Sequence, residues 1–164
     1  MTRWALAPRL VAVISLSASL PAQACWDAAA VRYGVSSELL YAIARTESAL
    51  NPQAVGRNQN GTRDIGLMQI NSAWLPTLAT HGIAERDLLE PCTNIQVGAW
   101  ILSGNVQRLG YTWDAIGAYH SASPARRHAY AERIYRQIAE GRRTAQLIPQ
   151  SIASAELSAA APPR

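Results

Sequence analysis

The chain has 164 residues, of which 49% are hydrophobic and 16% charged, so a folded domain is expected and wholesale disorder is excluded. All 15 basic residues are arginine, and the formal net charge is +4. The absence of lysine excludes Schiff-base catalysis and a phosphate-binding lysine of the Walker type, whereas the basic balance admits nucleic acid, a membrane surface or an anionic polymer as partner.

Residues 1–24 are typical of a secretory signal peptide. They combine two early arginines, an apolar run over residues 10–20 and the small-residue cleavage site Ala22-Gln23-Ala24. The apolar run is shorter than the roughly 20 residues of a membrane span. A lipoprotein signal is the less favoured alternative, because Ala22 stands where such signals usually carry leucine. We therefore expect a periplasmic or secreted protein that begins at Cys25 and has no stable membrane anchor.

The two cysteines, Cys25 and Cys92, are too few for a cysteine-based zinc ribbon but sufficient for one disulfide. Export would bring them to an oxidising compartment, where such a bond persists. A Cys25–Cys92 disulfide is the favoured interpretation, and two free thiols are the alternative.

Helical periodicity runs through most of the chain between the signal peptide and the C-terminal segment. The helices are expected at residues 26–33, 37–48, 94–109, 113–120 and 124–140. Their expected N-caps are Ser36, Thr93 and Thr112, and Gly34, Gly110 and Gly141 are expected stops. From residue 142 the sequence is rich in Ala, Ser, Pro and Gln, which predicts a flexible tail over 142–164 and a working domain over 25–141.

One stretch between the helices, residues 55–70, lacks this periodicity. It contains Asn58-Gln59-Asn60-Gly61, and Asn-Gly is a strong signal for a tight turn. Just beyond it, Asn71 is expected to cap the helical turn that contains Trp74. The predicted fold class is mainly α, an α+β domain with one short hairpin or irregular β region.

Glu47 is the first candidate for a catalytic residue. At about 100° per residue, it shares one face of its helix with Leu40 and Ile43, so a carboxyl group continues an apolar stripe. Burial raises the pKa of a carboxyl, and a protonated carboxyl near neutral pH is suited to general acid catalysis. The alternative is a glutamate that reaches solvent or pairs with a buried arginine.

Three strings around Glu47 resemble the signatures of lytic transglycosylases, enzymes that cleave bacterial peptidoglycan on a lysozyme-like fold. They are Glu47-Ser48-Ala49-Leu50-Asn51-Pro52, Gly66-Leu67-Met68-Gln69 and Ala118-Tyr119-His120, in the order of the family. The resemblance covers about residues 25–138. It is closest to small single-domain members that accompany type III and type IV secretion, conjugation and pilus systems, which also carry an early cysteine and a later Pro-Cys.

The resemblance implies that Glu47 protonates the oxygen between N-acetylmuramic acid and N-acetylglucosamine. The same carboxylate would then accept the proton of the muramyl C6 hydroxyl, which attacks its own C1 and leaves a 1,6-anhydro product. One carboxylate suffices for this reaction, unlike the pair of most glycosidases. The intramolecular attack gains from proximity, and the acid–base step from roughly 10²- to 10⁴-fold catalysis.

The resemblance further implies that a set of residues binds the substrate: Ser48, Gly66, Met68, Gln69, Tyr119, His120 and Tyr130. For Ser48 the alternative is a helix-end serine, and for Met68, Tyr119 and Tyr130 it is core packing. His120 stands where the family usually has asparagine, which puts asparagine-like binding in doubt and introduces a group that titrates near pH 6.5.

Asp64 is the candidate for a second carboxylate, because animal lysozymes also place an aspartate on the β region opposite the acid. A retaining, lysozyme-type hydrolysis with Glu47 and Asp64 would follow. The favoured alternative is a turn aspartate with local hydrogen bonds.

Two further interpretations of the whole chain are a non-catalytic cell-wall scaffold, against which the intact Glu47 argues, and a nucleic-acid binder, against which the signal peptide and the scattered arginines argue. The expected partners are peptidoglycan strands and components of a secretion or pilus system. We expect a monomer with no cofactor and no metal, since the three histidines lack ligand spacing.

Overall fold

The computed structural model describes the backbone of residues 22–159 and the side chains of residues 24–146. The predicted signal peptide up to residue 21 and the last five residues of the predicted tail lie outside the described residues. Within the described part, no helix is both long and apolar enough to cross a membrane.

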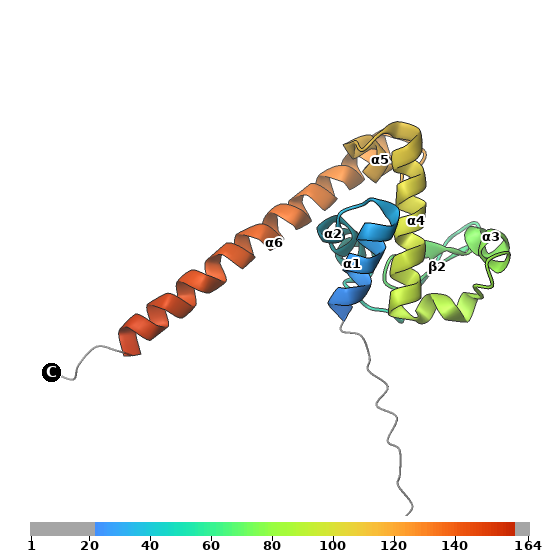
Figure 1. The fold of residues 1–164 in the computed structure, drawn as a ribbon. Coiled ribbons are helices and arrows are strands. Elements are labelled where there is room, and N and C mark those ends of the chain that lie inside the picture. Colours follow the sequence, from blue (N-terminus) through green and yellow to red (C-terminus); the bar gives the residue numbers. More distant parts are fainter. Residues whose placement is uncertain (1–21, 160–164) are drawn as a thin grey trace, which may run out of the picture.

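Five α-helices build the body of the domain (Figure 1): α1 (Ala22–Tyr33), α2 (Ser37–Ser48), α4 (Pro91–Leu109), α5 (Trp113–Gly117) and α6 (Pro124–Ala159). Helix α1 packs along α4, and the first turns of α6 pack on α2 and α5 before the helix projects away from the domain. Beside α4 stands a three-stranded antiparallel sheet in the order β1 (Val55–Arg57), β2 (Arg63–Ile65) and β3 (Ile70–Asn71). The predicted class, mainly helical with a short hairpin, is confirmed.

Short helical turns connect the sheet to α4. They are η1 (Ser72–Trp74), α3 (Leu75–Ala79) and η2 (Glu85–Leu89). The first begins as expected, because the Asn71 side chain accepts a hydrogen bond from the Ala73 backbone N–H at 3.0 Å. Trp74 is the last residue of η1.

The hairpin follows from its turn chemistry. Gly61 has a φ of 83°, and its N–H donates to the Asn58 carbonyl at 3.0 Å, which closes the predicted Asn-Gly turn between β1 and β2. The register pairs Val55 with Ile65 and Asp64 with Asn71. Ile65 therefore points into the core while Asp64, one residue earlier, lies on the other face.

The expected caps of α2 and α5 are present. The Ser36 hydroxyl accepts from the Leu39 N–H at 3.4 Å, and the Thr112 hydroxyl accepts from the Ala115 N–H at 3.2 Å. Helix α5 ends at Gly117 rather than at residue 120. A Cβ at Gly117 would collide with the backbone of Arg127, so the glycine permits the close crossing of α5 and α6.

Three further expected helix ends were wrong. Helix α1 begins at Ala22 instead of at residue 26. Helix α4 begins at Pro91 instead of after Thr93, because a proline with fixed φ and no N–H is suited to the first helical position. Helix α6 continues through Gly141, which does not adopt the positive φ of a helix-ending glycine. A glycine inside a helix costs only about 1 kcal/mol, which is too little to end it by itself. The helical backbone extends through Ala159, whereas the flexibility expected for residues 142–164 stays a prediction.

The beginning of α6 belongs to the domain core. Tyr130 and Ile134 are buried among Leu40 and Ile43 of α2 and Leu102 of α4. One turn beyond the core, the Arg142 guanidinium donates two hydrogen bonds, at 2.7 and 2.6 Å, to the Glu38 carboxylate at the start of α2. Helix α6 is thus attached to α2 by apolar packing and by this ion pair.

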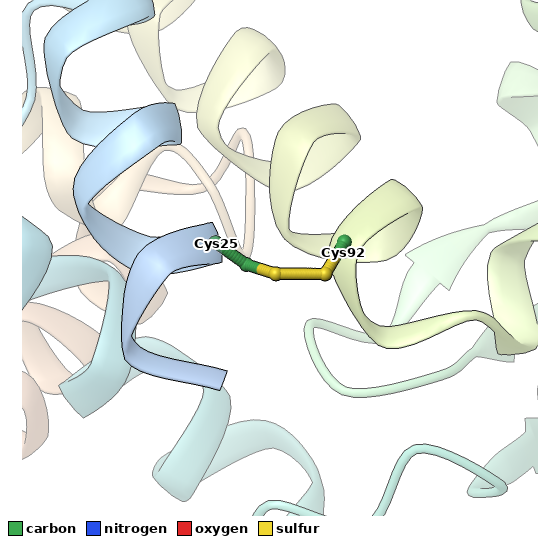
Figure 2. The surroundings of a disulfide bond; sticks show 2 residues. All are labelled: Cys25 and Cys92. Atoms are coloured by element: carbon green, nitrogen blue, oxygen red, sulfur yellow. A yellow bond between two sulfur atoms is a disulfide. The ribbon is translucent and has the colours of Figure 1, made fainter. Parts of the chain in front are cut away.

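The predicted disulfide between Cys25 and Cys92 is present, with the two Cα atoms 5.3 Å apart. Figure 2 shows that it joins α1 to the first turn of α4. It therefore fixes the beginning of the domain to its central helix.

Candidate active site

A cleft of about 410 Å³ opens between the helices and the sheet. Its lining comes from α2, the β region, η1, α4, the connection between α5 and α6, and the first turn of α6: Glu47, Asn58, Asp64, Gln69, Ile70, Asn71, Trp74, Ile101, Tyr119, His120, Ser121 and Arg126. The structure thus brings five of the predicted site residues to one cleft: Glu47, Asp64, Gln69, Tyr119 and His120.

Glu47 lies in the last turn of α2 and is half-buried at the wall of this cleft. The Tyr130 hydroxyl donates a hydrogen bond to its Oε1 at 2.6 Å. Burial raises the pKa of the Glu47 carboxyl, while the hydrogen bond from Tyr130 and the charge of Arg133 oppose that rise. The group is therefore biased toward the protonated form and has access to the cleft, as a general acid requires.

Tyr130 is 1% exposed and does not line the cleft. Its ring stacks on that of His120, with the centroids 4.9 Å apart and the planes 2° from parallel. The guanidinium carbon of Arg133 lies 5.4 Å from the same ring. Tyr130 therefore belongs to the core, as its place on the apolar stripe allowed, and reaches the site through its hydroxyl on Glu47.

His120 is exposed at the rim of the cleft. Partial desolvation lowers the pKa of its imidazole, and the neighbouring Arg133 and Arg126 charges lower it further. The ring is thus neutral at neutral pH, and in that form it resembles the family's asparagine in offering both a donor and an acceptor.

Asp64 faces the cleft from β2, but both of its carboxylate oxygens are engaged. Oδ2 accepts from the Asn58 amide at 2.8 Å, and Oδ1 accepts from the Asn71 amide at 2.7 Å. The carboxylate stabilises the hairpin, which agrees with the local hydrogen bonding that was the favoured interpretation of this residue.

The segment from Gly66 to Gln69 shapes the floor behind the cleft. Gly66 has a φ of 76°, and a Cβ there would collide with the Asn94 amide and the Leu88 carbonyl. Gln69 has a φ of 49°, and its side-chain nitrogen donates to the Gly66 carbonyl at 2.8 Å. Gln69 lines the cleft, whereas Gly66 is buried beneath it.

Ser48 and Met68 lie behind the cleft rather than on its lining. The Ser48 hydroxyl donates to the Leu67 carbonyl at 2.7 Å and so joins the end of α2 to this segment. Met68 is fully buried and packs against Gly98 of α4. Of the two interpretations made for Met68, core packing is the one that its position supports.

Tyr119 lines the cleft and also holds this floor in place. Its hydroxyl donates to the Met68 carbonyl at 2.9 Å. Burial raises the pKa of the Tyr119 hydroxyl well above its usual value, and the nearby Glu47 and Asp64 carboxylates add to the rise. The tyrosine therefore stays a neutral hydrogen-bonding group.

Asn94 of α4 is an organising residue that the sequence analysis missed. It is fully buried; its amide nitrogen donates to the Ile65 and Leu88 carbonyls at 2.8 Å each, and its oxygen accepts from the Met68 N–H at 2.7 Å. The signal available in the sequence was an amide directly beside the apolar stripe of its helix. Trp74 and Arg126, also missed, reach the cleft from segments whose local sequence carries no chemical motif.

The fold is lysozyme-like. It is shared with the lytic transglycosylase Slt of Pseudomonas aeruginosa, solved as the inactive mutant E503Q, with a TM-score of 0.58 and 23% sequence identity. The match covers 71% of this chain and spans 23% of the length of the Slt chain. At this level of identity the likeness defines the fold.

The chain belongs to the family of the transglycosylase SLT domain, whose model matches residues 24–139. It is 47% identical over 116 residues to the invasion protein IagB of Salmonella typhimurium, a match that covers 68% of this chain and 72% of that protein. It is 42% identical over 118 residues to protein IpgF of Shigella flexneri, covering 69% of this chain and 78% of that protein. A peptidoglycan-binding-like protein of Escherichia coli O157:H7 is 34% identical over 137 residues, covering 76% and 82%.

The resemblance that the three sequence strings indicated is therefore confirmed, and the chain is a lytic transglycosylase, an enzyme of peptidoglycan.

Proposed function

We propose that the enzyme cleaves the β-1,4 bond between N-acetylmuramic acid and N-acetylglucosamine with Glu47 as its single acid and base. The observation that carries this proposal is a carboxyl with a raised pKa that opens on the cleft and accepts a hydrogen bond from Tyr130. Glu47 gives its proton to the bridging oxygen as the bond to C1 breaks. The resulting carboxylate takes the proton of the muramyl C6 hydroxyl, whose oxygen bonds to C1 and forms the 1,6-anhydro ring.

Several neighbours of Glu47 support this assignment. Gln69, Tyr119 and His120 line the cleft with groups that can bond to sugar hydroxyls and N-acetyl groups. Ser48, Gly66 and Met68 would act one layer behind, by holding the backbone that carries Gln69. In this proposal the substrate-binding role passes chiefly to the three cleft-lining residues.

A lysozyme-type hydrolysis is the second candidate, and Asp64 is the residue that would make it possible. Its two oxygens each accept one amide hydrogen bond, which holds the carboxylate in place on the hairpin and leaves further lone pairs on both oxygens. The two reactions differ in their products, because hydrolysis adds water and the anhydro-forming reaction does not.

The test is mass spectrometry of muropeptides released from purified peptidoglycan in heavy-oxygen water. We expect 1,6-anhydro ends without heavy oxygen, and reducing ends that carry it would overturn the proposal in favour of hydrolysis. Glu47→Gln is expected to abolish release, whereas Glu140→Gln, an exposed change on α6, serves as the matched control. Release by Glu47→Gln at the wild-type rate would refute the role of Glu47.

We further propose that the mature protein begins at Cys25, acts in the periplasm or outside the cell, and opens the wall locally for a secretion or pilus apparatus. The signal-like residues 1–24 and the likeness to a protein named for invasion support this. Mass determination of the exported protein tests whether the mature chain begins at Cys25. Complementation of a deletion strain with wild type or Glu47→Gln tests the role in opening the wall. Secretion or pilus assembly by the apparatus should return only with wild type, while the two complemented strains should grow equally.

A further inference from the structure

Arg126 is a charged residue on the cleft lining to which the proposed reaction assigns no role. It lies in the first turn of α6, and its side chain is exposed. Over the part of the chain that the structure describes, no hydrogen bond or ion pair involves its guanidinium. Other arginines of the same helix are engaged, such as Arg127 with Asp114 at 3.0 Å.

Arg126 lies on the same helix as Tyr130, the hydrogen-bond partner of the proposed acid. Residues four apart on a helix lie on one face with about 5–6 Å between their Cβ atoms, so Arg126 stands one turn before Tyr130. Tyr130 bonds directly to Glu47. Arg126 and Glu47 line the same cleft, so a sugar bound beside Glu47 can present a substituent to the guanidinium.

Among the ionisable side chains that line the cleft, Arg126 is the one that carries a positive charge at neutral pH. Glu47 is biased toward its neutral form, and Asp64 is bonded to two amides of its own hairpin. His120, beside Arg126, has a lowered pKa and is neutral at neutral pH. The cleft thus has a carboxylate on β2 and a guanidinium on α6.

We propose that Arg126 binds a carboxylate of the substrate in the cleft. The inference rests on the proposed function, because it concerns the substrate of that same site. A guanidinium presents a planar pair of N–H donors that matches a carboxylate. In peptidoglycan the carboxylate comes either from the lactyl group of a muramic acid without peptide, or from the peptide stem.

The test is calorimetric binding of three soluble ligands to the Glu47→Gln enzyme, with and without Arg126→Gln. The first ligand is a glycan oligomer with its peptide stems, the second is the same oligomer freed of peptides by an amidase, and the third is an uncharged N-acetylglucosamine oligomer. We expect Arg126→Gln to weaken one of the first two by about tenfold, the scale of an exposed charge-assisted bond, and to leave the third unchanged. The ligand that loses affinity identifies the source of the carboxylate.

Two further variants separate the position of Arg126 from its charge. Arg143→Gln removes an exposed arginine from the same helix and should change no affinity. Arg126→Lys keeps the charge and should restore much of the lost binding. An equal loss on all three ligands, or no loss on any, would overturn the inference while the proposed function stands; failure of wild type to release anhydro products would instead overturn the proposed function.

Discussion

The Tyr130 hydroxyl donates a 2.6 Å hydrogen bond to Oε1 of Glu47, although the two residues are 83 positions apart. Because the tyrosine is 1% exposed and stacked on His120, its hydroxyl has little freedom to turn away. The bond both orients the carboxyl toward the cleft and stabilises its ionised form. It therefore links the core packing of α6 to the chemistry at the end of α2.

Removal of this hydroxyl is expected to move the pH profile of the enzyme. In Tyr130→Phe the Glu47 carboxylate loses a donor, so its pKa rises further above the usual value. Activity that needs the protonated acid falls as pH rises through this pKa, so the alkaline limb should move to higher pH. The rate at the optimum should fall roughly tenfold, because one charge-assisted bond no longer orients the acid.

Release of soluble muropeptides at a series of pH values measures both effects. Tyr135→Phe, an exposed change on the same helix, is the control and should leave the profile in place. An alkaline limb of the pH–activity profile that is unchanged in Tyr130→Phe, or that moves to lower pH, would contradict the role given to the hydrogen bond.

Glu47→Gln should make the protein more stable at neutral pH even as it abolishes activity. Burial disfavours the ionised carboxylate, so the folded-state pKa of Glu47 lies above the unfolded one. Wild type therefore loses stability as pH rises through the folded-state pKa, whereas glutamine has no charge to bury. The difference in Tm between variant and wild type should be small at pH 4 and should widen toward pH 7.

Thermal unfolding of both proteins between pH 4 and pH 7 measures whether the difference in Tm widens in this direction. Glu140→Gln, which changes an exposed carboxylate, should show no such widening. A wild type that gains stability over the variant with rising pH would mean that the Tyr130 bond and the Arg133 charge outweigh the burial of Glu47.

The sequence predicted those parts of the fold that depend on neighbouring residues. The caps Ser36 and Thr112 and the turn closed by Gly61 each satisfy backbone groups within four positions, so a local pattern is enough to find them. The prediction of where α4 begins was wrong because two start signals lie close together. The helix begins at Pro91 and not after the cap expected at Thr93.

The site was predictable only where one helix decides the outcome. The place of Glu47 on the apolar stripe of α2 predicted a carboxyl with a raised pKa, and that direction is what the structure gives. Whether Met68 faces the cleft or the core depends instead on α4, 30 positions away at Gly98, and the sequence left both open. The hydrogen-bond donors to Asp64 and Glu47 likewise lie on other elements, so the periodicity of a single element could not predict them.

Loss of the Asn94 side chain should destabilise the whole domain. Asn94→Ala leaves two buried carbonyls and the Met68 N–H without their partner. An unsatisfied buried group costs about 1–3 kcal/mol, so we expect the free energy of unfolding to fall by roughly 3 kcal/mol after partial relaxation. Urea unfolding followed by circular dichroism measures it.

Asn105 on the same helix is the matched control. It is also buried, but its amide nitrogen has no hydrogen-bond partner among the described residues, and its oxygen accepts only from Arg108. Asn105→Ala should therefore cost about 1 kcal/mol or less. Equal losses for the two variants would show that the cost arises from the cavity rather than from the hydrogen bonds that shape the cleft floor.

Replacement of both cysteines should lower the free energy of unfolding by about 4 kcal/mol in the chain-entropy model, since the Cys25–Cys92 bond closes a loop of 67 residues. Neither cysteine lines the cleft, so Cys25→Ser with Cys92→Ser should keep the wild-type product pattern at low temperature. Urea unfolding of the double variant, of oxidised wild type and of reduced wild type measures the effect. The last should match the double variant, because both lack the same constraint on the unfolded chain. If the double variant unfolds at the same urea concentration as oxidised wild type, the link between α1 and α4 adds nothing to stability and packing alone holds the two helices together.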